Sequence, residues 1–510
     1  MTWQHMGAGL LLLASLGGCT VGPTYHAPQV PVPTTWSEGQ PAGAEGQAAV
    51  TAQWWTTFKD ALLESLIARA VQANLDLHTA AARVREARAQ RGVTAADLWP
   101  TLNVSGSYTR QRASEHARTL PSGAASSAAG GGSPSVPLEQ NLFQTGFDAR
   151  WETDLFGGVR RSIEAATADL AASQEGLRDT LVSVLAEVAR NYVEVRGFQR
   201  RLAIAQDNIT AQQDTLELTR ARFDAGLTSA LDVTQAASQL ATTRAQVPSL
   251  ETSMKQGIHR LGVLTGQAPG ALLAELSTAA PIPTAPPEVL VGLPADLLRR
   301  RPDVRRAERQ LAAATARIGV ATADLYPTLS LTGSLGLASV TLTDLFTPAS
   351  RIWSVGPTLS WPIFDAGRIR ANIAVQDART EQQFTTYEQT VLTALEDVEN
   401  ALVAYSREQV RRVQLADAVA ANQQAVALAT DLYRAGLGTF LNVLDSERAL
   451  FASQSDLAQS EATIATNMVA LYKALGGGWE TLAPTPESHT TRAAASELTR
   501  GEHLASGRQP

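Results

Sequence analysis

Few side chains in this 510-residue chain have the types and spacing that catalysis or metal binding requires. The histidines are scattered, and the sequence contains no HExxH motif or Cys/His cluster; they lie at positions 5, 26, 78, 116, 259, 489 and 503. The run Gly130–Ser133 lacks the preceding strand and the following Lys-Ser/Thr of a phosphate-binding loop. Glu396 and Glu399 lie in a helical heptad pattern, where a solvated face explains them. We therefore expect no enzyme, no metal site and no catalytic cofactor.

Cys19, the only cysteine, does indicate a chemical modification. The apolar run Met6–Leu16 is too short to span a bilayer and is followed by small residues, which is typical of a secretory signal. Leu16-Gly17-Gly18-Cys19 resembles a bacterial lipobox, in which the cysteine becomes the acylated first residue of the mature protein. The resemblance implies diacylglycerol and N-acyl lipid on Cys19, and Thr20 after it favours the outer membrane. The alternative is a chance apolar leader with a stray thiol.

Composition limits the partners and marks the ends of the folded part. The net charge of −7 gives no indication of nucleic acid as a partner. We expect residues 1–18 to be a signal peptide, 19–55 an acylated tether and 479–510 a flexible tail, because the tether is rich in Pro, Gly, Ala and Gln and the tail is polar. After the leader, no apolar stretch reaches the roughly 18 residues of a transmembrane helix.

The rest of the chain contains an internal sequence repeat. "ADLWPTL" begins at Ala96 and "ADLYPTL" begins at Ala323, and the likeness continues on both sides. Such long-period similarity indicates a duplicated architecture, with a first repeat at 56–270, a linker or equatorial segment at 271–300 and a second repeat at 301–478. Pro100 and Pro327 are the expected joints between helix and strand, since proline cannot continue a helix interior.

Each repeat contains two segments with the dyad alternation of β-strands. We expect these strands at about 101–111, 142–155, 328–338 and 352–363. Their length fits transmembrane barrel strands, although a soluble half-buried sheet alternates in the same way. Four strands cannot close a barrel, because outer-membrane barrels begin at about eight, and open edges are not tolerated in hydrocarbon. A membrane sheet therefore requires other copies of the chain.

The remaining sequence predicts very long helices. No proline occurs from Val159 to Phe223, where apolar residues recur every seven positions, and Val391–Val426 repeats the pattern with a lapse at Arg412. Such sustained patterning favours coiled-coil packing, and about 65 residues span roughly 100 Å. Returning helices are expected near Ser229–Leu264 and Phe440–Leu475, after turns at Gly226 and Gly436.

These features together resemble the TolC/OprM outer membrane factors. The segments Leu293–Gly336 and Trp54–Leu77 are similar to the lipoprotein efflux branch of that family, often labelled NodT. The resemblance implies a mainly α protein with transmembrane β-strands, assembled as a homotrimer. Its twelve-stranded outer-membrane barrel, with four strands per chain, would continue as a twelve-helix periplasmic tunnel.

The resemblance also implies where the tunnel closes. "FLNVLDSE" is similar to the segment that narrows the closed pore in that family, and Leu441 and Asp445 match its leucine and aspartate. Three copies would form an apolar ring and an acidic ring. Without the resemblance, Leu441 as coiled-coil core and Asp445 as a surface charge is the stronger interpretation. The first hairpin lacks this spacing, because Leu231 and Asp232 are adjacent.

The hairpin tips are candidates for binding a periplasmic adaptor (a membrane fusion protein), because small residues there permit close helix approach. The candidates come from both tips: Arg222, Ala225, Gly226, Leu227, Arg434, Ala435, Gly436 and Leu437. Solvated caps that touch nothing are the alternative. The sequence thus predicts a passive, outer-membrane exit duct of a tripartite efflux pump, supplied with drugs or other small toxic compounds by an inner-membrane RND transporter. A duct for type I protein secretion and a periplasmic coiled-coil scaffold lipoprotein are the alternatives.

Overall fold

A computed structural model of the chain describes residues 20–37, 52–114, 138–286, 294–295 and 300–480. The chain divides into two compact units built from interleaved segments. The first, here called the strand unit, comprises Met1–Pro28, Arg85–Ala172 and Ala307–Tyr387. The second, the hairpin unit, comprises Gln29–Val84, Ser173–Arg306 and Glu388–Pro510. Each unit therefore contains segments from both halves of the sequence.

The order of the elements confirms the internal duplication. The first repeat runs α3 (Leu75–Ala96), β1 (Thr101–Arg112), β2 (Glu139–Thr153), α4 (Gly158–Asp224) and α5 (Ala230–Leu264). The second repeat runs α8 (Pro302–Ala323), β3 (Thr328–Ser339), β4 (Arg351–Ser360), α9 (Arg368–Arg434) and α10 (Phe440–Ala474). The corresponding helices have equal lengths of 22, 67 and 35 residues. Short elements complete the fold: η1 (Trp54–Phe58), α2 (Ala61–Ala73), α6 (Leu273–Leu276) and η4 (Pro348–Ser350).

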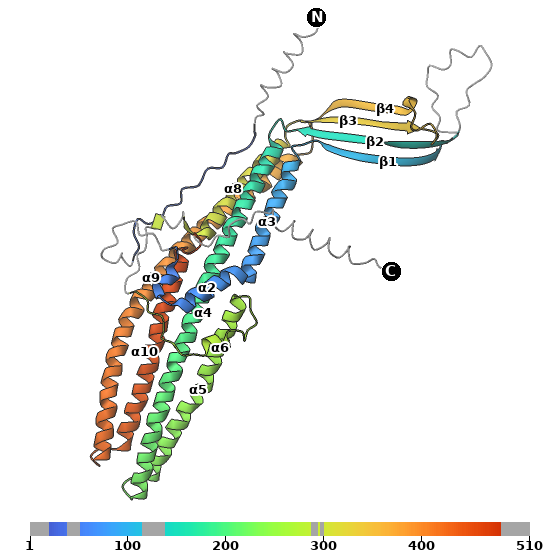
Figure 1. Cartoon of the computed structure of the whole chain (residues 1–510). Coiled ribbons are helices and arrows are strands. Elements are labelled where there is room, and N and C mark those ends of the chain that lie inside the picture. The colour runs from blue at the N-terminus through green and yellow to red at the C-terminus, as the bar shows by residue number, and fades with distance from the viewer. Residues whose placement is uncertain (1–19, 38–51, 115–137, 287–293, 296–299, 481–510) are drawn as a thin grey trace, which may run out of the picture. The chain divides into compact units, whose positions relative to one another are not determined.

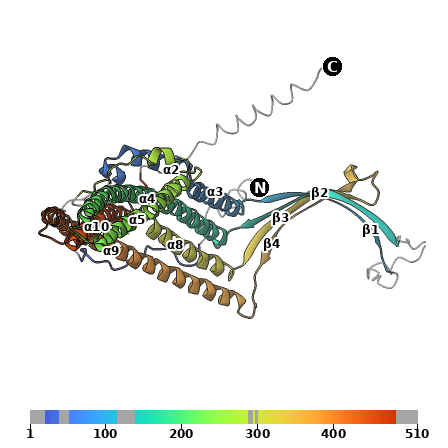
Figure 2. The same ribbon diagram turned by 90° about the horizontal axis from the view of Figure 1, so that it is seen from below.

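The strand unit is organised around one antiparallel sheet with the order β1-β2-β3-β4. Figure 2 shows the four strands side by side as one arched sheet. Every residue of β1 is exposed, and nearly every residue of β4 is exposed, so both edge strands present apolar and polar side chains outward. Within the described chain, β1 and β4 each pair along one side only. One copy therefore provides an open sheet with two free edges.

The predicted strand bounds are correct to within a few residues, with two notable corrections. β2 begins at Glu139 rather than near residue 142, because Glu139 still pairs with Arg112 and its carboxylate lies 2.7 Å from Arg110 Nη2. β4 ends at Ser360 rather than near residue 363. Pro362 lacks the amide hydrogen that a ladder needs, so the pairing stops before it.

The joints between helix and strand have the same construction in both repeats. Pro100 lies between the end of α3 and the start of β1, and Pro327 lies between α8 and β3. The Trp151 indole Nε1 donates to the carbonyl oxygen of Leu98 at 2.9 Å. The equivalent Trp361 Nε1 donates to that of Leu325 at 3.0 Å. Each indole satisfies a carbonyl that the ended helix leaves free, which fixes the next strand against the joint.

The long helices occur where the heptad pattern predicts them. α4 and α9 are continuous over 67 residues each, and the seven-residue series of α4 is buried at Leu181, Val188, Val195 and Leu216. Gly226 and Gly436 adopt positive φ values of 75° and 77° at the turns. The amide of Leu227 donates to Arg222 O and the amide of Leu437 to Leu432 O, both at 2.8 Å, which ends each helix with a glycine-dependent cap.

The hairpin unit places the hairpins α4–α5 and α9–α10 side by side with their turns at the same end (Figure 1). All four helices contribute to one buried apolar cluster near these turns, formed by Leu216, Ala236, Leu240, Tyr433, Phe440, Val443 and Leu444. Burying one such large side chain contributes about 1.5–3 kcal/mol. The cluster therefore fixes the two turns relative to each other within this unit.

Candidate functional site: the hairpin tips

Leu441 and Asp445 lie on α10 just after the second turn and project away from the apolar cluster. Leu441 is 52% exposed, whereas its neighbours Phe440 and Leu444 are 2% exposed. The Asp445 side chain is 64% exposed, and its carboxylate lies 3.9 Å from Arg448 Nη1. Four residues apart, the two side chains share one helix face. Leu441 is thus not core in this chain, contrary to the interpretation that its sequence alone favours, and Asp445 is a solvated charge.

The first hairpin uses its acid differently. Asp232 accepts a hydrogen bond from the Thr228 hydroxyl, and its own amide donates to Ser229 Oγ at 3.4 Å. These bonds close the start of α5 locally, as expected for an N-terminal capping arrangement. Leu231 beside it is 63% exposed. The two tips therefore differ chemically: Asp445 is exposed with only a long ion pair to Arg448 of its own helix, whereas Asp232 is hydrogen-bonded within its own turn.

The candidate docking residues at the tips divide into two groups. Leu227 and Leu437 are 65% and 79% exposed, and a side chain added at Gly226 would meet nothing within 4 Å. The small residues Ala225 and Ala435 precede the two turn glycines. Arg434 extends outward, with its side chain 64% exposed and 3.8 Å from Asp431. These residues leave both tips open to a partner.

Arg222 instead links the two tips to each other. Its Nη1 donates to the carbonyl oxygen of Arg434 at 3.1 Å, and its guanidinium carbon lies 4.7 Å from the centre of the Tyr433 ring. Because Tyr433 is only 3% exposed, such a cation–π contact contributes about 1–2 kcal/mol. Within the hairpin unit, Arg222 therefore holds the first hairpin against the second.

A buried polar contact between α4 and α10 lies beside the apolar cluster and was not expected from the sequence. Thr215 Oγ1 donates to Glu447 Oε1 at 2.6 Å, and Glu447 is 7% exposed. Burial raises the pKa of Glu447, and the hydrogen bond from Thr215 opposes this only in part. Glu447 follows Leu444 by three residues and Phe440 by seven, and this spacing could have indicated that it faces the core.

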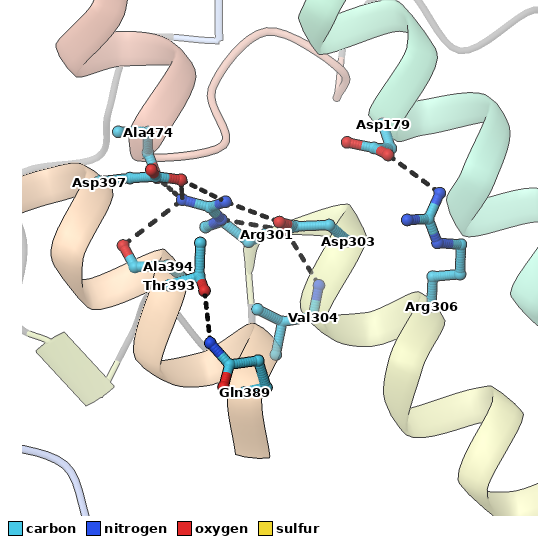
Figure 3. A network of polar contacts seen from close by, with 10 residues as sticks. All are labelled: Asp179, Arg301, Asp303, Val304, Arg306, Gln389, Thr393, Ala394, Asp397 and Ala474. Atoms are coloured by element: carbon cyan, nitrogen blue, oxygen red, sulfur yellow. Dashed lines mark hydrogen bonds and ion pairs between the residues drawn. The ribbon is translucent and has the colours of Figure 1, made fainter. Parts of the chain in front are cut away.

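A second unexpected polar network surrounds Arg301 at the start of α8 (Figure 3). Its guanidinium donates to Asp303 at 2.6 and 3.0 Å, to Asp397 of α9 at 3.0 Å, and to the carbonyl oxygen of Ala474 of α10 at 3.1 Å. Burial on its own raises the pKa of Asp303, but the hydrogen bond and charge of Arg301 outweigh it and lower the pKa overall. One side chain thus joins three helices of the hairpin unit.

Other charged groups of the hairpin unit continue this network. Arg306 Nη1 lies 3.1 Å from Asp179 of α4, as Figure 3 also shows. The guanidinium groups of Arg178 and Arg305 lie over the Trp479 ring, at 4.6 and 5.4 Å from its centre. The run Arg300-Arg301-Pro302-Asp303 lies within the segment Leu293–Gly336 that resembles the lipoprotein efflux branch. That resemblance did not indicate which residues these side chains contact.

The predicted lipidation residue, Cys19, lies outside the described residues. In the part of the chain that the structure describes, no helix combines the length and apolar character needed to cross a membrane. Over the same residues, no group of three or more His, Cys, Asp or Glu side chains could hold a metal ion.

Comparison with known proteins shows which family has this sequence and architecture. A sequence model of the family described as outer membrane efflux protein matches residues 66–267 and 293–477. Nodulation protein T of Rhizobium leguminosarum bv. trifolii is 34% identical over 474 residues, which cover 92% of this chain and 96% of that protein. The antibiotic efflux pump outer membrane protein ArpC of Pseudomonas putida is 34% identical over 468 residues, covering 91% of this chain and 93% of that protein.

Among solved structures, the outer-membrane channel OprN matches with a TM-score of 0.81 at 36% identity, covering 90% of this chain and 100% of that chain. The likeness therefore includes the sheet and both hairpins. It extends over a whole molecule and does not depend on one motif.

Proposed function

The chain belongs to the outer membrane efflux protein family, and from this premise we propose how it works as an exit duct. Its fold is that of the TolC/OprM channels, mainly helical with a small antiparallel sheet. Its relatives include an antibiotic efflux pump outer membrane protein and an outer-membrane channel. The chain accordingly resides in the outer membrane and conducts efflux there. Its cargo in this proposal is drugs or other small toxic compounds.

The working form in this proposal is a homotrimer. The sheet of one copy has two unpaired edges, β1 and β4, within the described chain. In hydrocarbon each unsatisfied backbone group costs several kcal/mol, so the edges must be paired. Three copies bring twelve strands, which is enough to close a barrel around a pore. The same three copies supply twelve long helices for the tunnel.

The second hairpin closes the tunnel in this proposal. Leu441 and Asp445 are exposed on one face of α10, so three copies can bring them together as an apolar ring and an acidic ring. An apolar constriction excludes water, and a ring of carboxylates attracts cations and repels anions. The first hairpin, whose Asp232 is engaged in its turn, follows the second through Arg222.

The exposed tips, with Leu227 and Leu437 outermost, are the proposed binding surface for a periplasmic adaptor. The adaptor connects the duct to an inner-membrane RND transporter, which supplies the energy. Lipid on Cys19 anchors the mature chain to the outer membrane, because several acyl chains together bind stably where one does not. No catalytic step is assigned to any residue.

The observation that carries the gate is the exposure of Leu441 and Asp445 beside buried neighbours. The test is single-channel conductance in planar bilayers for the wild type, for Leu441→Ala and for Asp445→Asn. We expect a small wild-type conductance, a larger one for Leu441→Ala, and weaker cation selectivity for Asp445→Asn. Leu231→Ala is the matched control, because Leu231 holds the equivalent position at the start of α5 and is 63% exposed, and this variant should leave conductance unchanged.

No conductance from any variant, combined with a monomeric state in detergent, would favour the scaffold lipoprotein instead. Drug accumulation in a deletion strain separates efflux from protein secretion. Unchanged accumulation together with loss of a secreted protein would refute the efflux role.

A further inference from the structure

The segment that follows Cys19 is held tightly against the strand unit. The Val21 amide donates to the carbonyl oxygen of Phe156 at 3.1 Å. Arg161 Nε donates to Val21 O at 3.1 Å, and its Nη2 donates to Gly22 O at 3.2 Å. The Arg161 side chain is only 6% exposed, and its third nitrogen is paired with Glu164 at 2.8 Å. A buried guanidinium is thus devoted largely to the backbone of this segment.

Three glycines make room for the segment. Gly22 has a φ of 84°, and a Cβ there would lie 2.4 Å from the Cα of Gly319 on α8. Gly157 has a φ of 83°, and a Cβ there would lie 2.9 Å from the Cα of Thr20. A Cβ on Gly319 would in turn lie 2.9 Å from the Arg161 side chain. Both positive φ values and the absence of Cβ atoms are needed for this close approach. We call Gly22, Gly157, Arg161 and Gly319 the N-terminal clamp.

A further contact fixes the segment a few residues later. The Tyr25 hydroxyl donates to Glu308 Oε1 of α8 at 3.1 Å, and the guanidinium of Arg309 lies 5.9 Å from the centre of the Tyr25 ring. The segment is therefore held at two places, at Val21–Gly22 by Phe156 and Arg161 and at Tyr25 by Glu308 of α8. A loose tether would need neither attachment, so this part of the N-terminal stretch is a fitted piece of the strand unit.

The clamp lies where the strands meet the helices. Gly157 follows the end of β2 and precedes α4, and Phe156 stacks on Tyr326 of the α8–β3 joint at 4.7 Å between ring centres. Because the strands are antiparallel, all four joints lie at this end of the sheet. Large apolar side chains are exposed at the other joints, with Trp99 at 72%, Ile363 at 86% and Phe364 at 90%. Aromatic side chains concentrated at one end of membrane strands are typical of a bilayer interface.

We infer that the N-terminal clamp is a positioning device for the membrane anchor, an inference that rests on the proposed acylation of Cys19. Cys19 is bonded to Thr20, so holding Thr20–Gly22 against the joint determines where the acyl chains enter the bilayer. The ligand is the periplasmic leaflet of the outer membrane, next to the strand ends. An anchor on a flexible tether adds only affinity for the membrane. A clamped anchor also keeps the strand ends close to the bilayer, and this high effective concentration favours insertion of the sheet.

The test combines Gly22→Ala with removal of the anchor. Gly22→Ala forces the segment off α8 without removing any side chain from the strand unit. Gly92→Ala is the matched control, because a Cβ at Gly92 of α3 would meet nothing within 4 Å. Arg161→Gln is the second clamp variant, with Arg317→Gln as its control, since Arg317 pairs with Asp169 on the surface at 47% exposure. Each variant is made in the acylated chain and in a Cys19→Ala chain behind an ordinary cleavable leader.

The readout is the fraction of membrane-inserted, heat-modifiable oligomer, with acylation followed by the mass of the N-terminal peptide. In the acylated chain, both clamp variants should lose most of the oligomer while keeping the lipid, and the controls should keep it. In the Cys19→Ala chain, the clamp variants should cause little further loss. Equal losses in both backgrounds, or none in either, overturn the inference. An unmodified Cys19 also overturns it, while conductance independently reports the duct.

Discussion

Arg301→Met tests whether the network around α8 holds the hairpin unit together. The substitution keeps a long side chain but removes every hydrogen bond of the guanidinium to Asp303, to Asp397 and to the carbonyl oxygen of Ala474. Breaking a buried ion pair by removing one partner costs about 3–5 kcal/mol. The Asp397 side chain is 47% exposed and can rehydrate, whereas that of Asp303 is 21% exposed. We therefore expect Arg301→Met to lower the free energy of unfolding by about 3 kcal/mol, at the lower end of that range.

Arg306→Met is the matched control, five residues later in the first turns of α8. Its partner Asp179 lies 3.1 Å away, but the two side chains are 42% and 33% exposed. An ion pair exposed to this extent is worth about 0–1 kcal/mol. The assay is urea unfolding of the detergent-solubilised protein, followed by helical circular dichroism and compared as shifts in midpoint. If Arg301→Met shifts the midpoint no more than Arg306→Met does, the network does not stabilise the unit and the reasoning fails.

The pH dependence provides a second check on the same pair. The pKa of Asp303 is lowered in the folded chain, so its ion pair adds stability above the unfolded pKa of about 3.9. That stability is lost as pH falls through the still lower folded pKa. The difference between wild type and Arg301→Met should therefore be constant near neutrality and shrink below about pH 4. A difference that persists unchanged at pH 3 would contradict the assignment.

Three further outcomes follow from the contacts described. Glu447→Gln should raise the thermal unfolding midpoint at neutral pH, because the raised pKa of Glu447 makes its ionised form unfavourable in the folded chain. This increase in midpoint should vanish as pH falls toward about 4.3, where the carboxyl becomes neutral in both states, and circular dichroism at several pH values measures the midpoint. Leu437→Glu should change stability by less than about 0.5 kcal/mol but weaken co-purification with the pump's adaptor, whereas Leu342→Glu in the β3–β4 loop, at a leucine that is also exposed, should leave co-purification unchanged. Trp361→Phe, which removes the bond to Leu325 O, should cost about 1 kcal/mol in thermal unfolding, as should Trp151→Phe at the equivalent joint; an unchanged midpoint would show that the indoles only pack.

The elements could be predicted from the sequence because their signals are local. The absence of proline over the long helices, the glycines at the turns and the prolines at the joints each act within a few residues. The bounds of α4 and α10 accordingly differ from expectation by about one residue. The start of β2 was misplaced because Glu139 and Gln140 are polar and gave no alternating pattern; only pairing with β1 identifies them as strand.

The contacts of the candidate site could not be predicted in the same way, because they join distant parts of the chain. Arg222 meets the carbonyl of Arg434 across 212 residues, and Arg301 meets that of Ala474 across 173. Nothing near Arg222 in the sequence distinguishes an outward arginine from one that binds the other hairpin. Exposure of Leu441 likewise depends on which face of α10 the other three helices cover.

The difference between Asp232 and Asp445 has a consequence for any ring-shaped partner. In the proposed trimer, the sheet joints, with their matching indole bonds, recur six times around the axis, so that end of the assembly is close to hexagonal. At the hairpin tips, by contrast, the outward-facing carboxylate of Asp445 recurs only three times and alternates with that of Asp232, which is engaged in its own turn. A ring of six identical subunits that binds these tips would therefore contact first and second hairpins alternately. Its subunits would have to bind in two distinct ways.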